Sequence, residues 1–202
     1  MFQHRSTTTL LSLVVFLFLM AEPRRVGGAG SPSPRPAPED AILFSRWLVN
    51  QSSYGVLATL DPLGLPFGNV MSFSDGGKGI PYFYLTTLLD PTGAYALRRP
   101  RASLTLSEYP LGFCTETNEP QWPVCAKITL SGRLRILAPN SREGVFAQDA
   151  LFRDHPQLAG WPTQPERGFH FFKLVVDQIF LVNLMAPARY PNVKDYIRYN
   201  NL

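Results

Sequence analysis

The chain lacks any hydrophobic run long enough to cross a membrane as a helix. Its longest apolar segment, Leu10–Met20 (LLSLVVFLFLM), has eleven residues, whereas a membrane span needs about twenty. The segment follows a short region containing Arg5 and precedes the small residues Gly27–Ala29. This order is typical of a secretory signal peptide cut after Ala29. We therefore predict a signal peptide over residues 1–29, with an uncleaved anchor or a misassigned start codon as the alternatives.

Charged residues are also few, at 17% of the chain, and the formal net charge is +4. Three of the 19 basic residues and one of the 15 acidic residues lie in the predicted signal peptide, so the mature chain has 16 bases against 14 acids. No run of lysine and arginine is interleaved with aromatic residues. Since nucleic-acid binding depends on a strong basic footprint, we expect no nucleic-acid partner.

Cysteine is scarce, and its spacing excludes two common roles. Cys114 and Cys125 do not form a CxxC redox motif, and no histidine pair accompanies them as a structural zinc site requires. In an oxidising compartment each is the other's only partner within the chain, so we predict a structural disulfide, with free thiols as the alternative. Its closed loop would stabilise the fold by about 3 kcal/mol.

Histidine is equally rare and gives no catalytic pattern. His4 lies in the predicted signal peptide, and His155 and His170 show neither metal-pair spacing nor a nucleophile elbow. We interpret the last two as structural residues. The sequence therefore predicts no metal site and no catalytic residues, and it makes a hydrolase the least favoured class of enzyme.

What the chain does contain is one foldable domain behind a short joint. Residues 30–38 (GSPSPRPAP) are rich in proline and serine and predict an extended, mobile linker. Residues 39–202 are enough for a single domain with a full core. Asn50 begins an Asn-Gln-Ser glycosylation sequon, at the point where a helix should give way to a strand. We predict an exposed, glycosylated Asn50.

The hydrophobic pattern predicts about seven strands and about three helices. Alternating or continuous apolar runs bounded by turn residues indicate the strands Tyr54–Leu60, Pro66–Ser74, Ile80–Thr86, Arg101–Tyr109, Ala126–Leu137, Phe169–Val176 and Gln178–Leu184. Helical spacing and capping signals indicate helices over Pro38–Val49, Asp90–Leu97 and Val145–Phe152, the last after a capping box with Asn140 as N-cap. Mostly short connections favour a mostly β (α+β) fold with a closed antiparallel barrel over a parallel sheet.

Several segments in order resemble the CREG family. They are FGNVMSFSDG, GIPYFYLTTL, RASLTLSEY, the cysteine-bracketed loop followed by AKITLSGRL, and His155-Pro156 with Trp161. The resemblance covers nearly the whole mature chain, and TTLLDPTGAYAL and SEYPLG look closest to plant members. It implies an FMN-binding split barrel, a homodimer, N-glycosylation, and secretion or delivery to the lysosome or vacuole.

The resemblance leaves flavin binding open. Wider relatives of this fold, such as pyridoxamine phosphate oxidase, hold the FMN phosphate with bases on the second strand and with hydroxyls and bases after the third. Here the second strand offers Asn69, Ser72 and Ser74 in place of bases. The candidate cofactor-binding residues are Ser72, Ser74, Thr86, Thr87, Arg98 and Arg99, with Arg101 nearby. The alternative is that these are ordinary surface and strand-end residues.

The sequence leaves two functions open. The favoured one is a non-catalytic secreted or vacuole/lysosome-directed glycoprotein that dimerises and binds another protein, with no cofactor. The other is an FMN-dependent oxidoreductase, or a binder of flavin or tetrapyrrole in the dimer cleft. A missing acid/base pair does not decide between them, because a flavin carries its own chemistry.

Overall fold

The computed structural model describes residues 33–114, 119–161 and 168–199. The predicted signal peptide and the first linker residues lie outside these ranges. The helices are α1 (Ala41–Gln51), α2 (Pro91–Arg98), the 3-10 turn η1 (Tyr109–Leu111), α3 (Arg142–Asp154), α4 (Pro156–Ala159) and α5 (Val193–Arg198). The strands are β1 (Tyr54–Leu60), β2 (Pro66–Ser72), β3 (Tyr82–Thr86), β4 (Arg101–Ser107), β5 (Lys127–Ile136) and β6 (Phe169–Val182).

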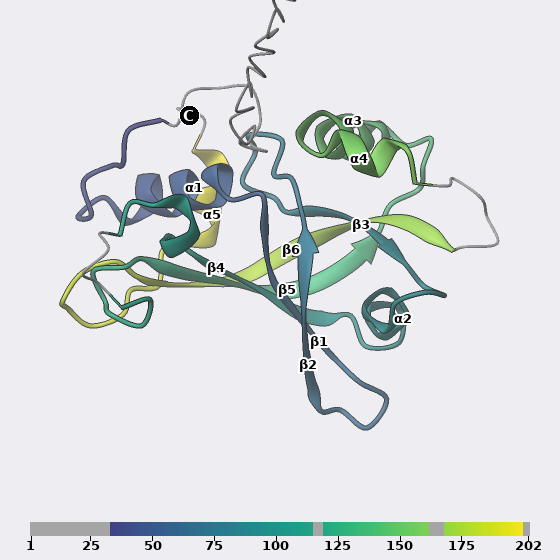
Figure 1. The fold of residues 1–202 in the computed structure, drawn as a ribbon, viewed down its shortest axis with the longest axis horizontal. Helices are drawn as coiled ribbons and strands as arrows, with labels where there is room; N and C mark the ends of the chain where they lie inside the picture. The colour runs from purple at the N-terminus through teal and green to yellow at the C-terminus, as the bar shows by residue number, and fades with distance from the viewer. Residues whose placement is uncertain (1–32, 115–118, 162–167, 200–202) are drawn as a thin grey trace, which may run out of the picture.

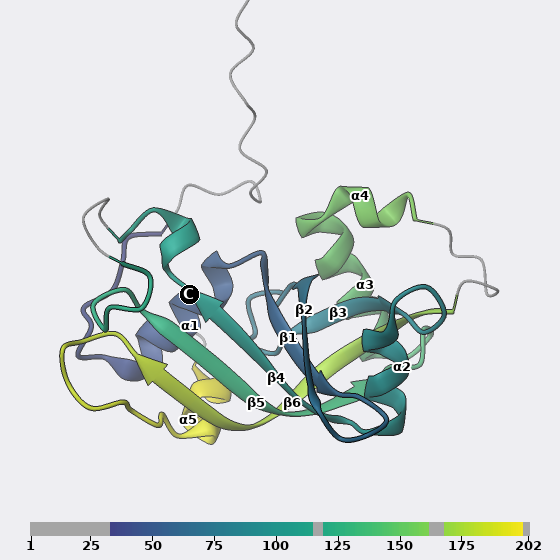
Figure 2. The same ribbon diagram turned by 60° about the horizontal axis from the view of Figure 1, so that its bottom comes forward.

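The strands form one antiparallel sheet that curls into a half-barrel (Figures 1 and 2). Their order is β2-β1-β4-β5-β6-β3. An isolated antiparallel bridge between Ser74 and Tyr82 joins the chain after β2 to the start of β3. Because β2 and β3 are the two edge strands, this bridge brings the sheet's edges together. The predicted mostly β, barrel-type fold is confirmed.

The described residues contain six strands rather than the predicted seven, because β6 is continuous. The hydrophobic pattern predicts two strands here, Phe169–Val176 and Gln178–Leu184, separated by Asp177. In the structure Ser131 pairs with Gln178 and Gly132 pairs with Val176, so Asp177 is the extra residue of a β-bulge. A bulge inserts one residue and bends a strand without ending it.

Helix α3 extends beyond the predicted Val145–Phe152 at both ends, and its N-cap lies one residue later than predicted. Ser141, not Asn140, is its N-cap, and its hydroxyl accepts a hydrogen bond from the Gly144 amide at 3.0 Å. With Ser141 as N-cap, Glu143 is at N2 rather than N3, so the predicted capping box does not form. The Glu143 carboxylate instead accepts a bond from Lys173 Nζ at 2.5 Å.

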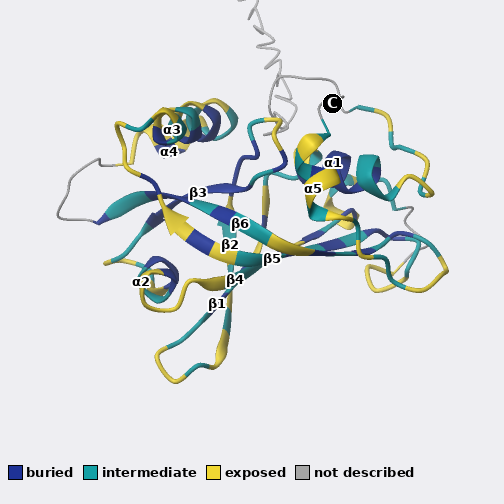
Figure 3. Cartoon of the chain, turned by 180° about the vertical axis from the view of Figure 1, so that it is seen from behind, coloured by how far each residue is buried: buried dark blue, intermediate teal, exposed yellow. Residues whose placement is uncertain are grey.

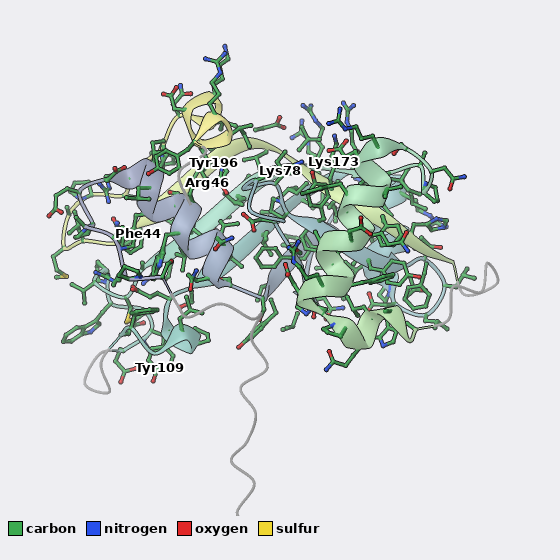
Figure 4. The ribbon with its side chains drawn as sticks, turned by 90° about the horizontal axis from the view of Figure 1, so that it is seen from above. Phe44, Arg46, Lys78, Tyr109, Lys173 and Tyr196 are labelled. Atoms are coloured by element: carbon green, nitrogen blue, oxygen red, sulfur yellow. A yellow bond between two sulfur atoms is a disulfide. The ribbon has the colours of Figure 1, made fainter. Side chains whose placement is uncertain are left out.

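Four helices cover the sheet in two groups, each over its own core, and α2 lies apart from both (Figure 1). Helices α1 and α5 pack over the larger core, to which they contribute Trp47 and Tyr196. Helices α3 and α4 pack over a smaller one that contains Tyr84, Leu151 and Phe171. The chain between β2 and β3 passes between the two groups, as the view from above shows at Lys78 (Figure 4).

Candidate functional site

A groove of about 1360 Å³ lies over the outer face of β1, β2 and β4. Strand alternation turns Leu57 inward and leaves Tyr54, Val56 and Val70 pointing outward, where they are 50%, 45% and 64% exposed. The segment Ser33–Pro36 and α1 line the groove on one side, and the end of α3 lines it on the other. Small-molecule pockets usually enclose about 300–1,000 Å³. The size and the exposed apolar strand residues suit a macromolecular surface better than a small ligand.

The polar residues at the α3 side of the groove are bonded to one another. Ser74 Oγ donates to Asp154 Oδ2 at 2.6 Å, and Arg153 Nε donates to Asp154 Oδ1 at 2.8 Å. The ring Nε2 of His155 lies 2.9 Å from the carbonyl oxygen of Phe73. These contacts fasten α3 to the chain after β2. The contact of the His155 ring with the Phe73 carbonyl adds to this attachment.

Asp75 organises the loop next to this cluster. Its carboxylate is buried and accepts bonds from the amides of Gly77 and Gly79, at 3.0 and 2.9 Å. Asn50 Nδ2 donates to the same carboxylate at 3.3 Å. Asn50 itself is exposed at the end of α1 and lines the groove. A glycan on this sequon would therefore stand at the groove's rim.

The two serines predicted to bind a cofactor lie at the groove end of β2. Ser72 is exposed and pairs in register with Tyr54, whereas Ser74 is buried and bonded to Asp154. Ser74 Oγ also accepts a bond from the Gly76 amide at 3.1 Å. Ser74 therefore has a structural role whether or not a ligand is present.

The other four candidates lie elsewhere. Thr86 ends β3, and the hydroxyl of Thr87 donates to the Gly168 carbonyl at 3.1 Å. Arg98 and Arg99 are exposed at the far end of α2. Arg99 donates to a carbonyl in the β1–β2 turn, which the seven residues of β1 separate from Ser72 by about 20 Å. The structure does not bring the six candidates into one site.

Strand β2 contacts the start of α2, the helix that follows β3. At this contact the structure has a carboxylate, Asp90, where a phosphate site would need a basic side chain. Asn69 Nδ2 donates to Asp90 Oδ2 at 2.8 Å and to Thr92 Oγ1 at 3.1 Å. Asp90 also caps α2 by accepting from the Thr92 amide. A carboxylate here repels a phosphate dianion. These residues do not fit an FMN phosphate, and sequence reasoning missed this contact between β2 and α2.

Two buried tyrosines, Tyr82 and Tyr196, donate hydrogen bonds and do not act as bases. Burial and the nearby Glu143 carboxylate raise the pKa of Tyr82 far above its ordinary value. Burial raises the pKa of Tyr196 in the same direction, and its hydroxyl donates to the Gly79 carbonyl at 2.9 Å. Both phenols therefore stay protonated at neutral pH and act as donors.

The cysteines are joined, as the sequence predicts. Cys114 and Cys125 form a disulfide with their Cα atoms 5.4 Å apart, within the usual range. The Cys125 side chain is buried, beside Ala126 at the entry to β5. The disulfide closes the loop that borders one side of the groove.

The described residues contain neither a cluster of metal ligands nor a helix suited to a membrane. Within 33–114, 119–161 and 168–199, no group of three or more histidine, cysteine, aspartate or glutamate side chains could hold a metal ion. No helix in the same ranges is long and apolar enough to span a membrane.

Solved structures define the class of fold. The heme-binding protein from Mycobacterium smegmatis matches with a TM-score of 0.64 and 20% identity, over 81% of this chain and 61% of that one. HutZ, the heme storage protein of Vibrio cholerae, matches with a TM-score of 0.55 and 18% identity, over 73% and 94%. The chain is a split-barrel protein, and at these identities the likeness shows the fold alone.

The family follows from the sequence comparisons. The family model CREG, beta-barrel matches residues 36–198, and the chain belongs to the CREG family. It is 38% identical to mouse Protein CREG2 over 167 residues, covering 78% of this chain and 56% of that protein. It is 32% identical to human Protein CREG1 over 207 residues, covering 91% and 92%. The chain spans 56% of mouse and 61% of human Protein CREG2.

Proposed function

We propose that this chain is a secreted or vacuole/lysosome-directed glycoprotein that works as a binding protein rather than as an enzyme. It acts as a homodimer that recognises another protein. The signal-peptide pattern and the Asn50 sequon support passage through the secretory pathway, and the disulfide fits its oxidising environment. The sequences of two segments, TTLLDPTGAYAL and SEYPLG, resemble plant members of the family and support a plant origin.

One observation carries the non-catalytic assignment. The contact of Asn69 with Asp90 fills the position from which bases would hold an FMN phosphate, and Arg98 and Arg99 lie at the other end of α2. A charge-assisted bond to phosphate contributes about 1.5–3 kcal/mol, so losing several such bonds removes most of the affinity. The competing FMN-dependent oxidoreductase or tetrapyrrole binder would have to hold its cofactor by other contacts.

Purified mature protein is expected to be colourless and to leave the absorbance and fluorescence of added FMN unchanged up to about millimolar protein. Asp90→Asn supplies the sharper test, because asparagine also caps helices well while it removes the negative charge. If Asp90 is what excludes phosphate, this variant gains weak FMN binding. A yellow native protein, or micromolar FMN binding by the unchanged chain, would establish the oxidoreductase class instead.

The homodimer proposal uses the apolar wall of the groove. Tyr54, Val56 and Val70 form a continuous exposed strip across β1 and β2, because Val56 pairs directly with Val70 and Tyr54 lies two residues along. Burial of apolar surface contributes about 25 cal/mol per Å². A second copy packed on this strip would cover it and enclose the groove between two subunits.

Val56→Asp is expected to convert the dimer to a monomer, because it buries an unpaired carboxylate at the interface. Sedimentation velocity at about micromolar protein should show the change. The matched control is Val145→Asp on α3, a valine of similar exposure, 47%, outside the groove. We expect this control to stay dimeric. An unchanged protein that sediments as a monomer, or equal dissociation by both variants, would refute the groove as the dimer interface.

A further inference from the structure

A row of basic side chains crosses the outer face of the sheet at the opposite end from the groove. It consists of Arg101, Arg133, Arg135 and Lys173, which we call the basic strip. Arg101 is directly opposite Arg133 on neighbouring strands, and Arg135 is directly opposite Lys173. Because Arg133 and Arg135 are two residues apart on β5, all four side chains share one face. The end of β5, which carries Arg133 and Arg135, is exposed (Figure 3).

Like charges directly opposite each other destabilise a sheet, and this strip contains two such pairs. Two acids offset them in part: Asp177 Oδ1 lies 3.0 Å from Arg133 Nη2, and Glu143 Oε2 lies 2.5 Å from Lys173 Nζ. Within the described part of the chain, Arg101 and Arg135 contact no carboxylate. An anion laid across the strip would relieve the repulsion that the sheet alone leaves unbalanced.

The spacing indicates a linear polymer rather than a single small anion. Neighbouring strands lie about 4.8 Å apart and alternate residues about 7 Å apart, so the four cations extend across three strands. Arginine binds sulfate and phosphate groups through two parallel hydrogen bonds. The strip's neighbours on this face include Ser103, Ser131 and Val175. Two aromatic rings adjoin Lys173, but Tyr82 and Phe171 are only 2% and 8% exposed in the core under α3, so they offer no free face on which a base could stack.

We propose that the basic strip binds a sulfated polysaccharide. The choice of a polysaccharide over a nucleic acid rests on the proposed secretory route and on the burial of the aromatic rings beside Lys173. Binding of an anionic polymer rests on the strip alone. The site lies apart from the groove and does not depend on the dimer.

Heparin is the probe, added to the mature, disulfide-bonded protein at about 0.15 M salt and followed by calorimetry. The double variant Arg101→Ser with Arg135→Ser removes the two cations without a carboxylate partner. We expect its affinity for heparin to fall about tenfold, with a weaker dependence on salt. The control, Lys194→Ser with Arg198→Ser on α5, removes the same charge from exposed positions and should change affinity less than about twofold.

Three results would overturn the proposal: no heparin binding by the unchanged protein, equal losses in both double variants, or single-stranded DNA binding the strip more tightly than heparin. The last would replace the polysaccharide with a nucleic acid. Urea unfolding without heparin separates a lost site from a lost fold. The strip variant should be at least as stable as the unchanged protein, because it removes repulsion.

Discussion

Arg46→Ala is expected to lower the free energy of unfolding by about 3–5 kcal/mol. Arg46 belongs to α1 and is 1% exposed, and its guanidinium lies over the ring of Tyr196 on α5 (Figure 4). Its guanidinium donates to the carbonyls of Tyr196 and Tyr199, at 3.1 and 2.8 Å, and to that of Gly77 at 2.6 Å. Truncation leaves these acceptors without their donor and opens a cavity, because alanine fills little of the space.

Urea unfolding at a fixed protein concentration measures this loss. Arg198→Ala is the control, since it removes the same charge from an exposed position on α5 and should cost less than about 0.5 kcal/mol. Hydrogen exchange adds a local readout, because α5 and the loop at Gly77 should lose protection together. A loss below about 1 kcal/mol would mean that water or neighbouring groups replace the guanidinium, and the role assigned to Arg46 would be wrong.

The same contact explains why sequence patterns missed α5. Its six residues, VKDYIR, are too few to show a helical period, and such short helices depend on tertiary packing. A capping signal was present, because Asn192 accepts bonds from the amides of Lys194 and Asp195. What secures the helix is Arg46, 150 residues away from Tyr196. No local pattern contains that information.

The strands were predicted better than the site, because the alternation of inward and outward side chains along a strand is a local property of the sequence. The alternation of Leu104 and Leu106, and of Ile128 and Leu130, predicted β4 and β5, and these four side chains are buried. The same alternation also turned Ile136 inward, which is wrong, because Ile136 is 47% exposed at the end of β5. The candidate site depended instead on how β2 packs against α2. Asn69 and Asp90 are 21 residues apart and meet only because of that packing. Residue types alone suggested hydroxyls and bases near a phosphate, and could not place a carboxylate among them.

Composition predicts an extended, mobile linker over residues 30–38. In the structure the described part of this segment, from Ser33 onward, is hydrogen-bonded to the domain. Trp47 Nε1 donates to the Ser33 carbonyl at 3.1 Å, and Asn183 Nδ2 donates to the Pro38 carbonyl at 2.9 Å. Arg35 makes the strongest attachment, through a two-pronged ion pair with Glu108. A low apolar content favours disorder of a segment. Here a charged residue on the domain, Glu108, binds Arg35 and holds the segment in place.

That ion pair gives the second large effect: Arg35→Ala should lower the free energy of unfolding by about 2–4 kcal/mol. Glu108 is fully buried, and among the residues that the structure describes its carboxylate would then keep only the Ala126 amide, at 2.9 Å, as a donor. An unpaired buried charge costs far more than the loss of an exposed pair. Arg153→Ala is the matched control, because its pair with Asp154 is largely exposed and should contribute less than about 1 kcal/mol.

A second substitution shows whether buried charge is the cause. Glu108→Gln in the Arg35→Ala background should recover about half of the lost stability, because a neutral amide is cheaper to bury and still accepts from the Ala126 amide. A purely steric role for the Arg35 side chain predicts no recovery, and equal losses for Arg35→Ala and Arg153→Ala would contradict the burial argument. Recovery would show that one basic residue in a proline-rich segment extends the folded domain beyond α1. It would also show that this segment is a fixed wall of the groove.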